Sequence, residues 1–165
     1  PPRSTLFPYT TLFRSTGTTN EANPQRYPTP DQSGVTGSTL ETYWKGGISA
    51  WGIELVKAGH SVETLPDGSS FTYGTPDSQD LSNYDLVIIV EPNKPFSSGE
   101  ITALLNFVAA GGGLFMVADH ETSDRDCDGW DSPHIFNDLT GATSATDAGV
   151  FGIWFRVDGD RKSVV

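Results

Sequence analysis

The sequence predicts an α/β protein with a mostly parallel sheet. The apolar run Leu86–Val90 has the aliphatic and β-branched residues of a strand buried on both faces. A helical pattern follows it, and a second apolar run, Leu114–Asp119, comes after the glycines Gly111–Gly113. A strand, a helix and a strand in this order form a parallel crossover, which is the building unit of α/β folds.

A further helix and a short strand are predicted before this crossover. Residues 16–38 are polar and contain several prolines, as in a loop. Four apolar residues then recur at helical spacing and share one face: Trp44, Ile48, Trp51 and Leu55. Gly59 suits the end of that helix. The alternating segment 61–66 predicts the strand.

The later elements have recognisable start signals. Ser97 and Glu100 have the spacing of a capping box, so they predict the start of the crossover helix. The glycines Gly111–Gly113 stop that helix. Ser132 and Pro133 predict another helix that runs through Leu139. Residues 150–157 predict one more strand.

The two ends of the chain differ in character from the rest. Thr5–Ser15 resembles the in-frame translation of a common sequencing-library adapter, and residues 160–165 resemble the translation of its reverse complement. We therefore expect residues 1–15 and 160–165 to be adapter-derived artefacts. The segment between them, residues 16–159, has the length of one domain, which we expect to be truncated at both ends.

Charge and composition limit the partners. The chain has 10 Lys and Arg against 21 Asp and Glu, a net charge of -11. Such a charge repels phosphate backbones, so nucleic acid is not expected as a partner. No apolar run approaches the length of a membrane span. Cys127 is the only cysteine, which rules out an intrachain disulfide. The many Ser, Thr, Gly and Asp residues favour an exported protein.

Polar side chains follow both strands of the crossover. Glu91 and Asn93 come after the first strand, and Asp119 and His120 come after the second. Ligands of open parallel sheets bind at the carboxyl ends of the strands, so we expect these residues to face one crevice. Glu91, Asp119 and His120 are the candidate catalytic residues. Asn93 is a candidate ligand-binding residue.

An acidic loop separates the second strand from the next helix. Asp124, Asp126 and Asp128 alternate, Gly129 follows, and Asp131 completes the candidate set of metal ligands. This resembles the first half of a calcium loop, so the loop is a candidate site for Ca²⁺ or Mg²⁺.

Other observations on this loop leave simpler interpretations open. A calcium loop of the helix–loop–helix type would place a glutamate where Ile135 stands, so that type of site is excluded. The aspartates could instead cap turns and the following helix. Trp130 could either pack the loop onto the domain or stack on a sugar. His134, near the start of the helix, is expected to be structural.

The stretch from Tyr84 to His120, with YDLVIIVEPN and ALLNFVAAGGGLFMVADH, resembles the class I glutamine amidotransferase-like domains. The longer stretch 26–139 resembles a bacterial branch of them that is often found in exported proteins. The resemblance implies a three-layer sandwich with a flavodoxin-like sheet. It also implies a first, central strand before Thr16, which we expect to be missing. Asp119 and His120 stand where an amidotransferase has its cysteine nucleophile, and neighbouring aspartates disfavour a thiolate at Cys127. Glutamine amidotransfer is therefore not expected.

Two functions remain compatible with the sequence. The first is a binding or scaffolding domain of an exported bacterial protein, with a divalent cation in its acidic loop and a small molecule or carbohydrate as ligand. The alternative is a metal-assisted hydrolase of a sugar or ester that uses Asp119 and His120. We favour the first, because no complete catalytic constellation can be assembled from the residues present and fold class alone does not define an activity.

Overall fold

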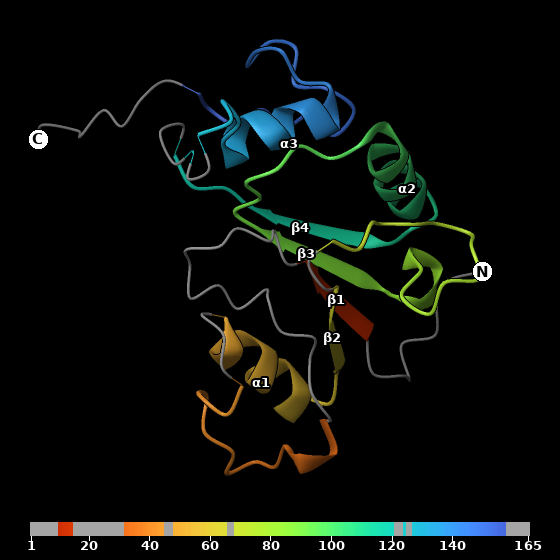
Figure 1. Ribbon diagram of the computed structural model, residues 1–165, viewed down its shortest axis with the longest axis vertical. Coiled ribbons are helices and arrows are strands. Elements are labelled where there is room, and N and C mark those ends of the chain that lie inside the picture. The colour runs from red at the N-terminus through yellow and green to blue at the C-terminus, as the bar shows by residue number, and fades with distance from the viewer. Residues whose placement is uncertain are drawn as a thin grey trace, which may run out of the picture.

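The computed structural model describes residues 10–14, 32–44, 48–65, 68–120, 124 and 127–157. Its strands are β1 (Thr10–Arg14), β2 (Ser61–Leu65), β3 (Leu86–Val90) and β4 (Gly113–Val117). Its α-helices are α1 (Ser49–Lys57), α2 (Ser98–Ala109) and α3 (Ser132–Thr140), and two short 3-10 helices are η2 (Gln32–Gly34) and η3 (Leu81–Asn83). Figure 1 shows the strands side by side between the helices.

The strands form one parallel sheet in the order β2-β1-β3-β4. This confirms the predicted α/β class and the predicted crossover from β3 through α2 to β4. The strand β1 belongs to the adapter-like segment, and it pairs with β2 on one side and β3 on the other. The central position that we expected to be missing is therefore filled by residues 10–14 in this structure.

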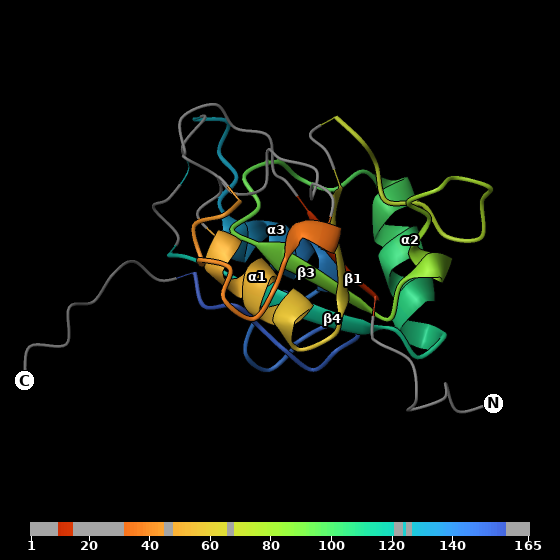
Figure 2. The same ribbon diagram turned by 90° about the horizontal axis from the view of Figure 1, so that it is seen from below.

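Helices cover both faces of the sheet, with α1 on one side and α2 and α3 on the other (Figures 1 and 2). The strand β3 supplies both cores, because its side chains alternate between the two faces. Val87 and Ile89 pack with α2 and α3, whereas Ile88 packs with the cluster around α1. All three are at most 1% exposed, so the prediction of a strand buried on both faces is confirmed for β3.

The ends of the helices agree with their sequence signals. The capping box of Ser97 and Glu100 is present at the start of α2. The helix α3 begins after the cap Asp131, with Pro133 in its first turn. After α2, Gly111 adopts a positive φ of 94°, and a Cβ at Gly112 would come within 2.3 Å of the Phe107 ring.

The predicted helical face from Trp44 to Leu55 is only partly helical. The helix α1 begins at Ser49, and Trp44 lies in a turn before it. Trp44 and Ile48 nevertheless pack in the same apolar cluster as Trp51 and Leu55. The periodicity thus identified the buried side chains correctly but overestimated the length of the helix.

Two strand predictions need correction. The strand β4 is at the edge of the described sheet and is not buried on both faces, since Phe115 is 49% exposed. Residues 150–157 do not form a strand. Gly149 and Gly152 adopt positive φ angles, which suit a turn, and the backbone of Phe155 bonds to the side chain of Asn137 at 2.8 Å in both directions. Among the described helices, none has both the length and the apolar character needed to cross a bilayer.

Candidate functional site

The carboxyl ends of β3 and β4 lie at the same level of the sheet. Val90 of β3 pairs with Val117 of β4, and these are the last residues of their strands. The next amide, that of Glu91, donates a hydrogen bond of 2.8 Å to the carbonyl of Val117. Glu91 therefore leaves the sheet beside the segment that carries Asp119 and His120. The strands β3 and β4 are thus neighbours, which the expectation of one shared crevice requires.

The carboxyl group of Glu91 interacts with both polar residues that follow β4. Burial raises the pKa of Glu91 above its usual value, and the negative charge of Asp119 raises it further. The charge of His120 acts in the opposite direction but does not cancel these effects. The structure thus brings all three candidate catalytic residues into one electrostatic group at this edge.

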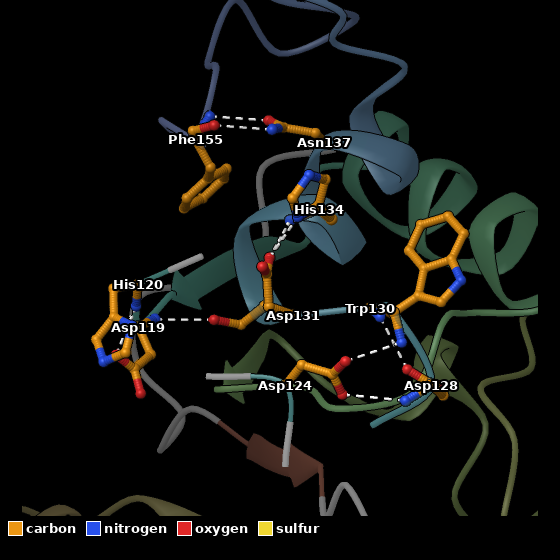
Figure 3. Close-up of polar contacts among 11 residues, drawn as sticks. Asp119, His120, Asp124, Asp128, Trp130, Asp131, His134, Asn137 and Phe155 are labelled. Atoms are coloured by element: carbon orange, nitrogen blue, oxygen red, sulfur yellow. Dashed lines mark hydrogen bonds and ion pairs between the residues drawn. The ribbon is translucent and has the colours of Figure 1, made fainter. Parts of the chain in front are cut away.

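Asp119 is fixed by the backbone and by α3. Its carboxylate accepts a 2.5 Å hydrogen bond from the amide of His120 and lies 3.4 Å from Nε2 of the same histidine. Its own amide donates a 2.8 Å hydrogen bond to Oγ of Ser132, in the first turn of α3 (Figure 3). The side chain of His120 is 55% exposed, so the imidazole can reach a ligand in solution.

Ser132 is a supporting residue that the sequence did not single out. Its side chain is buried, with the residue 1% exposed, and it lies 13 positions after Asp119 in the chain. The sequence signal at Ser132 was that of a helix start. The contact with Asp119 depends on how α3 packs on the sheet, and local sequence does not contain that information.

Neither of the two candidate ligand-binding residues is fully exposed in this structure. Asn93 is 2% exposed, so its amide lies in the interior beneath the edge. Trp130 is half-buried and packs against the core formed with α2 and α3. This favours the interpretation in which Trp130 packs the loop onto the domain.

The described aspartates of the acidic loop accept hydrogen bonds from nearby amides (Figure 3). Asp124 accepts from the amides of Asp128 and Gly129, at 3.2 and 2.8 Å. Asp128 accepts from the amide of Trp130 at 2.8 Å. These hydrogen bonds agree with the alternative interpretation, in which the aspartates cap turns.

The last aspartate of the loop caps α3. Oδ1 of Asp131 accepts from the amide of His134 at 3.0 Å and lies 2.7 Å from Nδ1 of the same residue. This confirms the structural role expected for His134. Asp126 lies outside the described residues. Within the described part, no group of three or more His, Cys, Asp or Glu residues is arranged to hold a metal ion, and the cation site stays a prediction.

Cys127 does not lie at a strand end. It is exposed, with a positive φ of 58°, in the loop between β4 and α3. The position directly after β4 instead carries Ala118, Asp119 and His120.

No family model, no curated protein and no solved structure matches the chain. The chemistry open to the chain follows from the residues at the carboxyl edge of the sheet. Two carboxyl groups and an imidazole can hydrogen-bond to the hydroxyl groups of a small ligand, and they can also move a proton.

Proposed function

We propose that the chain is a glutamine amidotransferase-like domain that binds a small polar molecule, of the carbohydrate class, at the carboxyl edge of its sheet. The arrangement of β2, β3 and β4 supports this proposal. The strands β3 and β4 are neighbours, and one strand position, occupied here by the adapter-like residues 10–14, separates β2 from β3, which agrees with a flavodoxin-like sheet whose own first strand is central. Helices on both faces of the sheet agree with a three-layer sandwich. The protein that contains this domain is proposed to be bacterial and exported.

The convergence of Glu91, Asp119 and His120 carries the proposal. Open parallel sheets bind their ligands at the carboxyl edge, and the three side chains interact there across two strands. A net charge of -11 disfavours anionic ligands. A neutral molecule with several hydroxyl groups suits a site made of carboxyl groups and an imidazole.

Glutamine amidotransfer is not part of the proposal. That reaction needs an activated cysteine nucleophile after the strand, where this chain has Asp119. Cys127 is exposed and lies in the loop between β4 and α3, not directly after the strand.

Hydrolysis of a sugar derivative or ester is the second candidate function. It is favoured by the pairing of an acid of raised pKa, Glu91, with Asp119 and His120. Acid and base roles are commonly divided between groups whose environments shift their pKa values apart. In the metal-assisted form, a cation held by the acidic loop would activate the attacking water.

One titration tests the binding proposal. Glucose, galactose and N-acetylglucosamine are added separately to the 15N-labelled full chain. We expect amide shifts to concentrate at Glu91 and residues 118–120 for at least one sugar. His120→Ala should weaken that binding about tenfold, because it removes a hydrogen bond to a ligand group. His134→Ala, at an exposed histidine that contacts Asp131, should leave binding unchanged and serves as the matched control.

The same samples separate binding from hydrolysis. Release of nitrophenol from nitrophenyl glycosides and esters, lost in Asp119→Asn, would favour the second candidate. Shifts that concentrate away from the carboxyl edge, or the absence of shifts with all three sugars, would contradict the carbohydrate proposal.

A further inference from the structure

The two edges of the described sheet are finished differently. The strands β2 and β4 form these edges (Figure 1). At β2, the side chain of Gln32 lies against the edge and accepts a 2.8 Å hydrogen bond from the amide of Val62. At the other edge, β4 pairs with β3 alone among the described strands. The β4 edge is therefore the one that offers its backbone groups to a further strand.

The residues of β4 do not prevent such pairing. Edge strands are commonly protected by a charged side chain or a proline, and the sequence of β4, GLFMV, has neither. None of its five residues is buried, whereas three residues of β3 are at most 1% exposed. Phe115, at the centre of β4, is 49% exposed. An uncharged, apolar strand at an edge is a template for pairing with another strand.

The hydrogen bonds at the two ends of β4 show which of its backbone groups face outward. The amide of Gly113 donates to the carbonyl just before β3, and the carbonyl of Val117 accepts from the first amide after β3, both at 2.8 Å. Successive residues of a strand direct these groups to alternate sides. The amides and carbonyls of Leu114 and Met116 therefore point away from β3, to the open edge.

We propose that β4 is the contact surface of a homodimer, in which the β4 strands of two copies pair antiparallel about a two-fold axis at Phe115. Leu114 of each copy then lies opposite Met116 of the other. The outward groups of each such pair exchange two hydrogen bonds, so this register leaves none of them unpaired. The proposal does not rest on the proposed function, because it uses none of the side chains of the candidate site.

This register brings apolar side chains together and keeps like charges apart. Counted from the axis, Asp119 of one copy comes to the level of Gly111 of the other, so the carboxylates do not oppose each other. The Phe115 side chains of the two copies share one face of the joined sheet and meet at the axis. Each ring already packs edge-to-face on Trp51 of α1, with 5.5 Å between the ring centroids. The contact therefore covers the exposed side of both Phe115 rings.

The pairing closes at two copies and is weak. It is isologous, since both copies use the same strand, and the edge left at β2 in each copy carries the side chain of Gln32. A pair of five-residue strands buries less than the roughly 800 Å² per partner of a standard stable interface. We therefore expect a Kd on the order of 100 µM.

Sedimentation velocity of the full chain, from about 10 µM to about 1 mM, tests the association. We expect the mean mass to rise from 17.7 kDa toward twice that value. Phe115→Lys places a charge at the axis and should stay monomeric throughout. Val150→Lys, at a residue that is 67% exposed and lies outside the sheet, should associate like the wild type and is the matched control. A mass that stays at 17.7 kDa, species beyond the dimer, or equal behaviour of the two lysine variants would overturn the proposal.

Cysteine cross-linking tests the register. In a Cys127→Ser background, Phe115→Cys places the two thiols at the axis, where opposite Cα atoms are about 4.5 Å apart and within the range of a disulfide. The two copies of Val117→Cys are about 13 Å apart, because each lies opposite Gly113 of the other copy. Mild oxidation should therefore link Phe115→Cys into dimers on a non-reducing gel and leave Val117→Cys monomeric. Linking of both variants, or of neither, would contradict the antiparallel pairing.

Discussion

At the scale of single residues, Asp80 shows how one buried carboxylate can organise a loop. Asp80 is 0% exposed and caps η3. Its two oxygens accept six hydrogen bonds, from Thr72, Gly74, Thr75 and Ser82. Burial alone would raise the pKa of Asp80, but the hydrogen bonds from Ser82 and Thr75 outweigh it and hold the pKa far below its usual value. The ionised form is therefore part of the fold.

Replacing Asp80 should destabilise the protein strongly. We expect Asp80→Ala to lower the free energy of unfolding by about 3 kcal/mol, because buried donors lose their acceptor. Because the pKa of Asp80 is lowered in the folded state, its contribution is present above the ordinary value of 3.8 and is lost as the pH falls below it. Urea denaturation at pH 7 and pH 3 measures both effects.

A matched control for this prediction lies in the same loop. Asp77 is exposed, and its carboxylate accepts one local hydrogen bond, from the amide of Gln79. Asp77→Ala should cost less than about 1 kcal/mol. Equal losses at the two positions, or a loss at Asp80 that is the same at both pH values, would refute the role assigned to Asp80.

At the scale of elements, the sequence was most informative where the signals are local. The strand β3, the capping box of α2 and the proline start of α3 all depend on neighbouring residues, and all three are present. The exposure of β4 could not be predicted in the same way. An apolar run looks alike whether its strand is central or at an edge, and its position depends on how distant strands pair.

The same distinction between local sequence signals and tertiary packing applies to the candidate site. The grouping of Glu91 with Asp119 and His120 could be predicted, because parallel strands bring their carboxyl ends to one edge. The left-handed turn at Glu91 and the contact of Asp119 with Ser132 could not, since both depend on tertiary packing. The failed strand at 150–157 has the same origin, because the side chain of Asn137 binds the backbone there.

The capping box of α2 gives a prediction at this scale. Ser97 accepts from the amide of Glu100, and the buried Glu100 also accepts from the amide of Phe71 at 3.3 Å. We expect Ser97→Ala to lower the free energy of unfolding by about 1 kcal/mol, measured by urea denaturation. The adjacent Ser98 is exposed and does not cap the helix, so Ser98→Ala should have little effect. Similar losses in both variants would count against the cap.

At the scale of the whole molecule, the adapter-like strand β1 and the candidate site involve different parts of the sheet. The strand β1 lies in the middle of the sheet and pairs on both sides. The candidate site depends on the ends of β3 and β4, which pair directly with each other. The central claim is therefore that Glu91 and Asp119 interact across the carboxyl edge of this strand pair.

A double-mutant cycle at Glu91 and Asp119 tests that claim most directly. The free energy of unfolding is measured at pH 8 for the wild type, Glu91→Gln, Asp119→Asn and the double variant. Each single change should remove the same repulsion between carboxylates, so the double variant should gain less than the sum of the two, by at least about 0.5 kcal/mol. Strictly additive effects would mean that the two side chains do not interact, and the site proposed here would not exist.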